Sequence, residues 1–300
     1  MIPKVLTMLV FAALVLGTIP AEAKVWHVSI KTGSNNNDAS KAKPLKNIDR
    51  AVKKSRPGDT IKVAEGTYMG TFKVGYVEFK HPVKIYGGFS TDFSRRDPMK
   101  YQTVFQPDNA SGKRARKPFF QWKSGKKTGG TVIDGFLFDM GERNNYHAKK
   151  GKPRDLPTGM LILPPGKGSQ PVQTVIQAII SFQSGSKADG GVITIENNVF
   201  VNGANFAVQA AINRGTILVR NNVFINNRMA AVEIFGTCRK AGPGKFNKCG
   251  KAEVSNNTIL FTWTRLKDFL DMGYGVRIMG GMEYNIHHNI IGSSTMTGTE

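Results

Sequence analysis

Acidic side chains are scarce in this chain of 300 residues, where 21 Asp and Glu stand against 42 Lys and Arg. The resulting net charge of +21 predicts attraction to polyanions. We expect the partner to be an acidic polysaccharide or an anionic cell surface, and we expect no nucleic acid, because the sequence begins like that of an exported protein. A basic surface that only keeps the protein in solution is the alternative.

Long apolar runs are also lacking. A short one lies at 5–17, between Lys4 and an Ala-Glu-Ala sequence at 21–23. A positive start, a short apolar stretch and a small-x-small cleavage pattern are typical of a signal peptide, and 5–17 is too short to span a bilayer. We therefore predict a signal peptide at 1–23, no membrane span in the mature chain, and a secreted or periplasmic location. An N-terminal anchor helix is the alternative.

Cysteine is limited to two residues, Cys238 and Cys249, which flank a loop rich in Lys and Gly. In an oxidising compartment this pair predicts one disulfide that closes the loop. Two thiols are too few for a metal site. The adjacent His287 and His288 should point to opposite faces of a strand, so we predict no metal site.

Four short segments repeat one pattern, in which a polar corner is followed by β-branched or aromatic residues. They lie at 195–200, 219–224, 254–259 and 286–291, with spacings of 24, 35 and 32 residues. Short β-runs at such a period predict a solenoid, with surface insertions in the longer gaps. The predicted fold is all-β, a parallel β-helix.

Stacked coils bring equivalent residues together. Asn198, Asn222, Asn257 and Asn289 should form a ladder at one corner, since Asn tolerates the left-handed backbone of a tight corner and stacked amides bond to one another. Side chains alternate in and out along a strand. This alternation predicts inward positions at Ile193, Ile195, Ile217, Val219, Ala252, Val254, Tyr284 and Ile286.

The N-terminal segment has a different pattern. A strand is expected at 25–29, a helix at 44–55 and a strand at 61–63. The apolar face of the helix consists of Leu45, Ile48, Ala51 and Val52. A helix laid across the open end of a solenoid covers apolar side chains and unpaired backbone groups, so we predict an N-terminal capping helix.

The pattern at 43–68, with Lys-Pro-Leu-Lys-Asn-Ile at its start, Arg-Pro-Gly-Asp-Thr-Ile at 56–61 and Glu-Gly-Thr-Tyr at its end, resembles the cap and first coil of secreted right-handed parallel β-helix proteins. These form the pectate-lyase-like superfamily, which includes the alginate lyase and chondroitinase B group. Segments 85–98 and 132–136 resemble uncharacterised β-helix repeat proteins more closely. The resemblance implies one right-handed β-helix domain over 24–300. No C-terminal cap is recognisable, which favours a chain that is incomplete at that end.

Insertions interrupt the coil rhythm at 142–190, at 238–250 and at 262–272. We expect a strand at 159–163 inside the first of them. Loops of this kind either form the sides of a ligand-binding groove or are insertions without a functional role.

A second column of residues is the candidate ligand site. Segments 207–211, 231–235 and 275–279 align with one another, and 159–163 is expected to precede them. With their valines pointing inward, Gln209, Glu233 and Arg277 point outward, flanked by Phe235 and Met279. An amide, a carboxylate, an arginine and an aromatic on one rigid sheet predict a sugar-binding face formed by Gln209, Glu233, Phe235 and Arg277. An ordinary polar face with one ion pair is the alternative.

Another outward pair, Glu196 and Arg220, lies in register on adjacent coils. We expect a surface salt bridge there, which contributes about 0–1 kcal/mol.

Lyase chemistry on a uronate needs a group that neutralises the substrate carboxylate, a base and an acid. Arg277 is the candidate clamp or base and Glu233 the candidate cation holder. The Lys/Arg signature of the alginate lyase group is not reproduced, and no Asp-Asp pair of the β-helix pectin hydrolase kind occurs. No cofactor is expected, except Ca²⁺ if the protein is a lyase.

The leading functional prediction is therefore binding of acidic polysaccharide at a basic groove, with polysaccharide lyase activity as the enzymatic option. The alternative is a non-catalytic, adhesin-like surface solenoid whose repeats serve display.

Overall fold

The computed structural model describes most of the chain after residue 21. None of the described helices is long and apolar enough to cross a membrane. The described residues are 22–71, 75–106, 118–123, 125–141, 146–147, 170–171, 178–183, 191–203, 205–236, 250–262 and 273–294.

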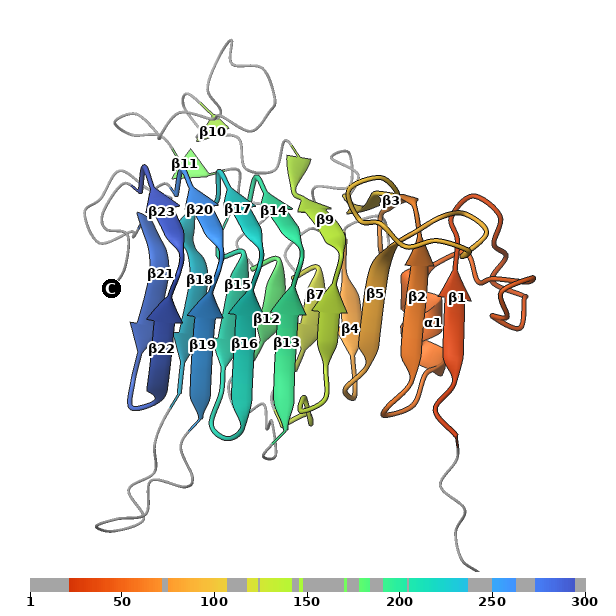
Figure 1. The fold of residues 1–300 in the computed structure, drawn as a ribbon, viewed down its shortest axis with the longest axis horizontal. Coiled ribbons are helices and arrows are strands. Elements are labelled where there is room, and N and C mark those ends of the chain that lie inside the picture. The colour runs from red at the N-terminus through yellow and green to blue at the C-terminus, as the bar shows by residue number, and fades with distance from the viewer. Residues whose placement is uncertain are drawn as a thin grey trace, which may run out of the picture.

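Three parallel sheets form the walls of a single solenoid (Figure 1). Sheet 1 contains β1 (Val25–Val28), β2 (Thr60–Ala64), β5 (Lys84–Phe89), β8 (Val132–Asp134), β13 (Val192–Glu196), β16 (Thr216–Arg220), β19 (Lys251–Ser255) and β22 (Glu283–His287). Sheet 2 contains β3 (Gly66–Tyr68), β6 (Thr103–Phe105), β9 (Phe136–Asp139), β14 (Val199–Val201), β17 (Val223–Ile225), β20 (Thr258–Leu260) and β23 (Ile290–Gly292). Sheet 3 contains β4 (Val77–Phe79), β7 (Phe120–Trp122), β12 (Ile180–Phe182), β15 (Val208–Ala211), β18 (Met229–Phe235) and β21 (Gly273–Met279).

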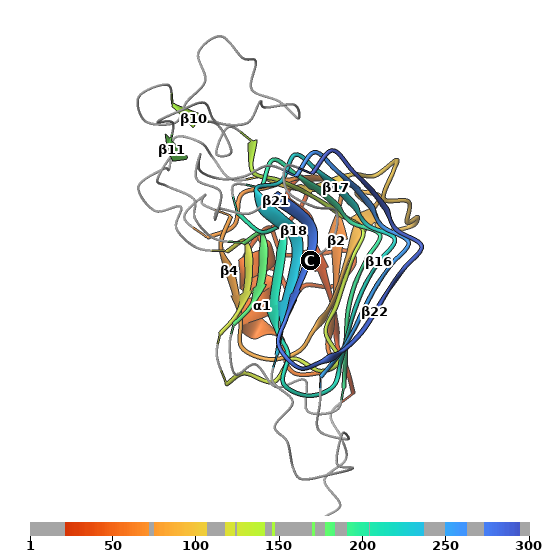
Figure 2. The same ribbon diagram turned by 90° about the vertical axis from the view of Figure 1, so that its left-hand side faces the viewer.

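Each coil passes from sheet 1 to sheet 2 to sheet 3, and the end-on view in Figure 2 shows the three walls around a common interior. The short strands β10 (Tyr146–His147) and β11 (Gln170–Pro171) pair antiparallel, apart from the three sheets. The architecture confirms the predicted right-handed parallel β-helix.

The interior is a stack of apolar side chains. The predicted inward residues of β13, β16 and β19 are at most 3% exposed, whereas Tyr284 and Ile286 of β22 pack on the core but are partly exposed. Phe138, Phe200 and Phe224 stack face to face, with ring centroids 5.1 and 4.8 Å apart. Those spacings match the distance of about 4.8 Å between hydrogen-bonded strands, so the rings follow the coil repeat.

The asparagine ladder is confirmed. Asn198 donates from Nδ2 to Asn222 Oδ1 at 3.1 Å, Asn222 to Asn257 at 3.1 Å, and Asn257 to Asn289 at 2.9 Å. The left-handed backbone lies one residue earlier than predicted, at the positions that precede the ladder. These are Asn197, Asn221, Asn256 and His288, with φ between 54° and 56°. In each coil, the residue with positive φ makes the turn, and the ladder asparagine that follows it points its amide into the corner.

The N-terminal cap is also confirmed, with a shorter helix. The helix α1 spans Ile48–Lys54 and contacts β1, β2 and β4. Leu45 lies outside it and forms a parallel bridge with Val28. The free edge of β1 is paired with the loop before the helix, because His27 N donates to Ala39 O and Ser29 N donates to Leu45 O. This pairing covers the exposed edge of sheet 1.

An ion pair joins the two segments that carry the resemblance to β-helix repeat proteins. Arg96 Nη2 donates to Asp134 Oδ1 at 2.7 Å, and Arg96 Nε donates to Gly87 O at 3.0 Å. Gly135 has φ +81°, and a Cβ on it would lie 2.7 Å from Arg96 Nη2. The Asp-Gly sequence at 134–135 therefore provides both the partner and the space for the arginine.

The prediction for the long insertion was partly wrong. The strand that precedes β15 in sheet 3 is β12, at Ile180–Phe182, so the coil resumes inside 142–190. Residues 159–163, like Cys238 and Cys249, lie outside the described residues, and the disulfide stays a prediction.

Candidate functional site

A column of polar residues runs across the outer face of sheet 3. The parallel register aligns one residue from each strand. From β4 to β21 these residues are Glu78, Gln121, Ser181, Gln209, Glu233 and Arg277. Their chain neighbours on either side point into the core, where Phe79, Trp122 and Phe182 stack with centroids 4.0 and 4.6 Å apart. We call this row the sheet 3 column.

Glu233 is the centre of its C-terminal half. Gln209 Nε2 donates to Glu233 Oε1 at 2.8 Å, and Arg277 Nη1 donates to Oε2 at 2.6 Å. The side chain of Glu233 is only 3% exposed and that of Arg277 is 18% exposed. An ionised carboxylate at this depth needs such donors, since an unpaired charge is costly to bury. The structure thus brings together three of the four predicted ligand residues.

Phe235, the fourth, lies two residues beyond Glu233 on the same face of β18. It is half-buried and in register with Ala211 and Met279, and Met279 is 38% exposed. Arg277 also approaches the ring of Tyr274, with its guanidinium carbon 6.0 Å from the centroid. An arginine between a carboxylate and an aromatic ring is held in one orientation.

The N-terminal half of the column has a second charged group, Glu78. Lys123 Nζ lies 2.8 Å from Glu78 Oε2, and the hydroxyl of Tyr76 donates to the same oxygen. Burial, and then the hydrogen bond and charge of Glu78, raise the pKa of Tyr76 well above its ordinary value. Tyr76 is therefore a neutral donor at all ordinary pH values.

Within each of these two clusters, the positive and negative charges balance. Glu78 and Lys123 form one pair, and Glu233 and Arg277 form the other. These pairs add no net charge, so the long-range attraction of polyanions that the net charge predicts must come from other parts of the surface, whatever face makes the contact. One such part is the cap, where six exposed basic side chains lie on α1 and the loop before it. They are Lys41, Lys43, Lys46, Arg50, Lys53 and Lys54.

The other predicted outward pair is on sheet 1. Arg220 Nε donates to Glu196 Oε2 at 2.7 Å, which confirms the predicted salt bridge. Arg220 is 41% exposed, so solvent screens the interaction and its contribution is small.

The histidine pair differs from the prediction. Because His288 has φ 54°, the strand alternation is broken there, and Nδ1 of His287 lies 2.6 Å from Nδ1 of His288. Glu253 Oε1 is 4.0 Å from His287 Nε2. In the part of the chain that the structure describes, no group of three or more His, Cys, Asp or Glu is placed to hold a metal ion.

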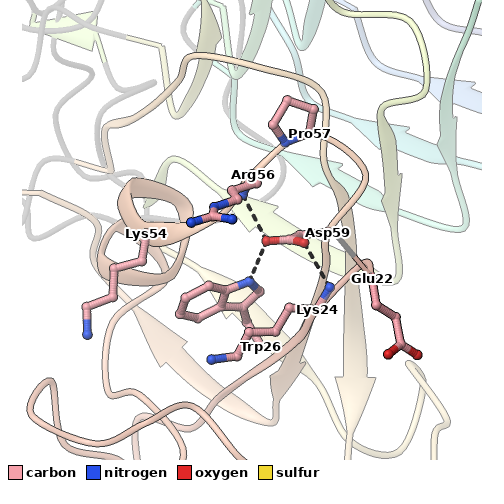
Figure 3. A pocket seen from close by; sticks show the side chains of 7 residues that line it. All are labelled: Glu22, Lys24, Trp26, Lys54, Arg56, Pro57 and Asp59. Atoms are coloured by element: carbon pink, nitrogen blue, oxygen red, sulfur yellow. Dashed lines mark hydrogen bonds between the residues drawn. The ribbon is translucent and has the colours of Figure 1, made fainter. Parts of the chain in front are cut away.

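A pocket at the N-terminal end is lined by residues of β1, of α1 and of the turn that follows α1 (Figure 3). Asp59 is at its base, with Trp26 Nε1 donating to Oδ2 at 2.8 Å. Its lining residues are Glu22, Lys24, Trp26, Lys54, Arg56, Pro57 and Asp59.

Gln121, Ser181 and Glu78 were missed in the sequence. A signal for two of them exists, because Phe-Phe-Gln-Trp at 119–122 and Ile-Ile-Ser-Phe at 179–182 share an apolar-apolar-polar-aromatic pattern. The irregular spacing around the insertions hides it. The loop between the cysteines also carries Lys240, a further candidate for lyase chemistry at this face, and this residue lies outside the described residues.

Fold and register define the protein as a right-handed parallel β-helix with a polar column on one sheet. Residues 31–91, which contain the cap and the first coil, match the family described as "Protein of unknown function (DUF1565)". No curated protein matches the chain. A solved structure, "The complex structure of XylC with xylose", is similar with a TM-score of 0.44 at 12% identity, over 90% of this chain and 59% of that chain. The chain thus spans about three fifths of that protein.

Proposed function

We propose that the protein is an exported β-helix that binds an acidic polysaccharide. The net charge of +21 carries this proposal, because a surface with that excess attracts polyanions over several ångströms. Export is part of the proposal and rests on the signal-peptide pattern at 1–23. In that setting the common polyanions are uronate-containing polymers and anionic cell surfaces.

The proposed contact face is the C-terminal half of the sheet 3 column, with Gln209, Glu233, Phe235 and Arg277. Parallel strands space such residues about 4.8 Å apart, which suits a ligand that extends across the coils. Glu233 orients the guanidinium of Arg277, and a guanidinium can present two parallel N–H groups to a sugar carboxylate. Phe235 offers an apolar face beside it.

Binding is better supported than lyase chemistry. In a uronate lyase a base removes the proton next to the carboxylate, the bond to the leaving sugar oxygen breaks, and an acid protonates that oxygen. Both oxygens of Glu233 accept hydrogen bonds from protein groups, and Arg277 is paired with it. These two candidates are thus engaged with each other, so neither is placed to act as the base or the acid of a lyase.

The test is a panel of polyuronates and a neutral polysaccharide, titrated calorimetrically against the secreted protein, with ultraviolet absorbance followed in the same samples. Binding of polyuronates without new absorbance supports the proposal. A rise in absorbance from an unsaturated product would instead assign lyase activity.

A non-catalytic, adhesin-like surface solenoid is the second candidate. The internal pairing of the charges in the sheet 3 column favours it, since such a column needs no ligand to be satisfied. Equal, weak affinity for all polysaccharides in the panel would support this candidate.

A further inference from the structure

One backbone nitrogen near the predicted cleavage site points at a carboxylate. Lys24 N donates to Asp59 Oδ1 at 2.9 Å (Figure 3). The carbonyl of the same residue accepts from Thr60 N at 2.9 Å, so the chain is anchored where β1 meets the start of β2. Glu22 and Ala23 are exposed, and their removal uncovers no core.

The surroundings of Asp59 favour its ionised form. It is 4% exposed and accepts hydrogen bonds from Lys24 N, from Trp26 Nε1 and from Arg56 N. Burial alone would raise the pKa of Asp59, but these three hydrogen bonds hold that pKa below its ordinary value. Among the residues that the structure describes, none places a counter-charge in direct contact with this buried carboxylate, whose three donors are neutral.

We propose that Asp59 is the receptor for the new amino terminus that signal-peptide removal creates. Hydrolysis of the bond between Ala23 and Lys24 consumes one water and leaves a carboxylate on Ala23 and an ammonium group on Lys24. The nitrogen that now donates as an amide to Asp59 becomes a cation at the same place. This inference rests on the export proposed above, and it assigns the processing site to that bond.

Because of this ion pair, removal of the signal peptide should stabilise the N-terminal cap in a pH-dependent way. The charged neighbours of this pair are Lys54 of α1, Arg56 of the following turn and the Lys24 side chain, and His81 is a titratable neighbour. The carboxylate of Glu22 leaves with the signal peptide. The Asp59 carboxylate should raise the pKa of this ammonium group above its unfolded value, so its stabilisation is present below about pH 8 and is lost as pH rises through the folded pKa. The Asp59 pKa is lowered, so its stabilisation is present above about pH 4 and is lost as pH falls.

The role of Asp59 as receptor can be tested with two forms of the chain. Each is produced as a fusion and released by a protease that leaves no extra residue at the new amino terminus. One starts at Lys24 and the other at Ala23, which moves the amine away from Asp59. The pH dependence of acylation of the α-amine, followed by mass spectrometry, measures its pKa. For the Lys24 start we expect a pKa about one unit above the ordinary 7.7–8.0, and hence roughly tenfold slower acylation at neutral pH. In the form that starts at Ala23, the α-amine should have its ordinary pKa and acylation rate.

Asp59→Asn in the Lys24 form should return the amine to its ordinary pKa, whereas Asp92→Asn, at an exposed carboxylate in another loop, should not. If Asp59→Asn fails to fold, the comparison of the two starts decides, because residue 59 is unchanged in both. If the α-amine had the same pKa in the two forms, the proposal that Asp59 receives the new amino terminus would be wrong. A mature mass that begins elsewhere than Lys24 would overturn the processing site. Neither readout depends on polysaccharide binding.

Discussion

Glu233 and Arg277 are 44 residues apart in the chain and directly opposite one another on β18 and β21, with 2.6 Å between Oε2 and Nη1. The pair lies on the outer face of the solenoid and yet Glu233 is almost fully buried. An outward position on a β-helix is therefore not the same as an exposed one. For this reason Arg277 is expected to matter for stability as well as for ligand binding.

Arg277→Ala should lower the unfolding free energy by about 2 kcal/mol, because it leaves one oxygen of a buried carboxylate without its donor. It should also remove most polyuronate binding. Arg277→Lys should recover part of the stability and little of the binding, since an ammonium group lacks the planar fork. Thermal unfolding and calorimetric titration measure the two effects.

The matched control is Arg220→Ala, which breaks the exposed pair with Glu196. It should change stability by less than about 1 kcal/mol and leave binding unaltered. If both alanine variants weaken binding equally and slightly, attraction is spread over the whole basic surface and the sheet 3 column is no ligand site.

Asn222→Ala should destabilise the solenoid by about 2–4 kcal/mol. The side chain is 1% exposed; its Nδ2 donates to Ile195 O and Asn257 Oδ1, and its Oδ1 accepts from Asn198. Alanine removes all of these buried hydrogen bonds. Denaturant unfolding measures the loss. Asn285→Ala, on an exposed position of β22, should stay within about 0.5 kcal/mol of the parent protein.

Arg96→Ala should loosen the segment between β5 and β6. Asp134 is 5% exposed and would retain only the hydrogen bond from Asn197 Nδ2, so a loss of about 2 kcal/mol is expected. Limited proteolysis should show new cleavage near 90–98. Unchanged cleavage and unchanged unfolding would mean that Arg96 does not anchor this segment.

Binding to alginate-like or heparin-like polymers should weaken steeply as salt is added. Screening shortens from about 10 Å at 0.1 M to about 3 Å at 1 M, and most basic side chains of the cap are exposed. Affinity measured across this range of salt tests the expectation. Salt-insensitive binding, or equal binding of neutral polymers, would contradict the electrostatic argument.

Thiol titration of the unfolded, unreduced secreted protein should find no free thiol, because Cys238 and Cys249 are expected to be joined. Two free thiols would rule the disulfide out. Reduction should loosen the loop between the cysteines and leave the coils intact, since ladders and core stacking hold the coils.

Much of the fold follows from the sequence through short-range periodicity. Strands in a parallel β-helix stack at one spacing, so the same alternation of apolar and polar residues recurs in every coil and identifies inward residues such as Ile195 and Val219. The asparagine ladder and the Glu196–Arg220 pair were predicted in the same way, from equivalent positions in successive coils. The alignment of Gln209, Glu233 and Arg277 was also visible in the sequence.

Only the tertiary structure decided how those residues meet. The period breaks around 142–190, so the place of β12 and the contribution of Ser181 to the column could not be read from spacing. Burial of Glu233 depends on what surrounds an outward side chain, which alternation along one strand does not specify. Asp59 likewise gathers donors from Lys24, Trp26 and Arg56, which β1 and the turn before β2 bring together in space although they are far apart or irregularly spaced in the chain.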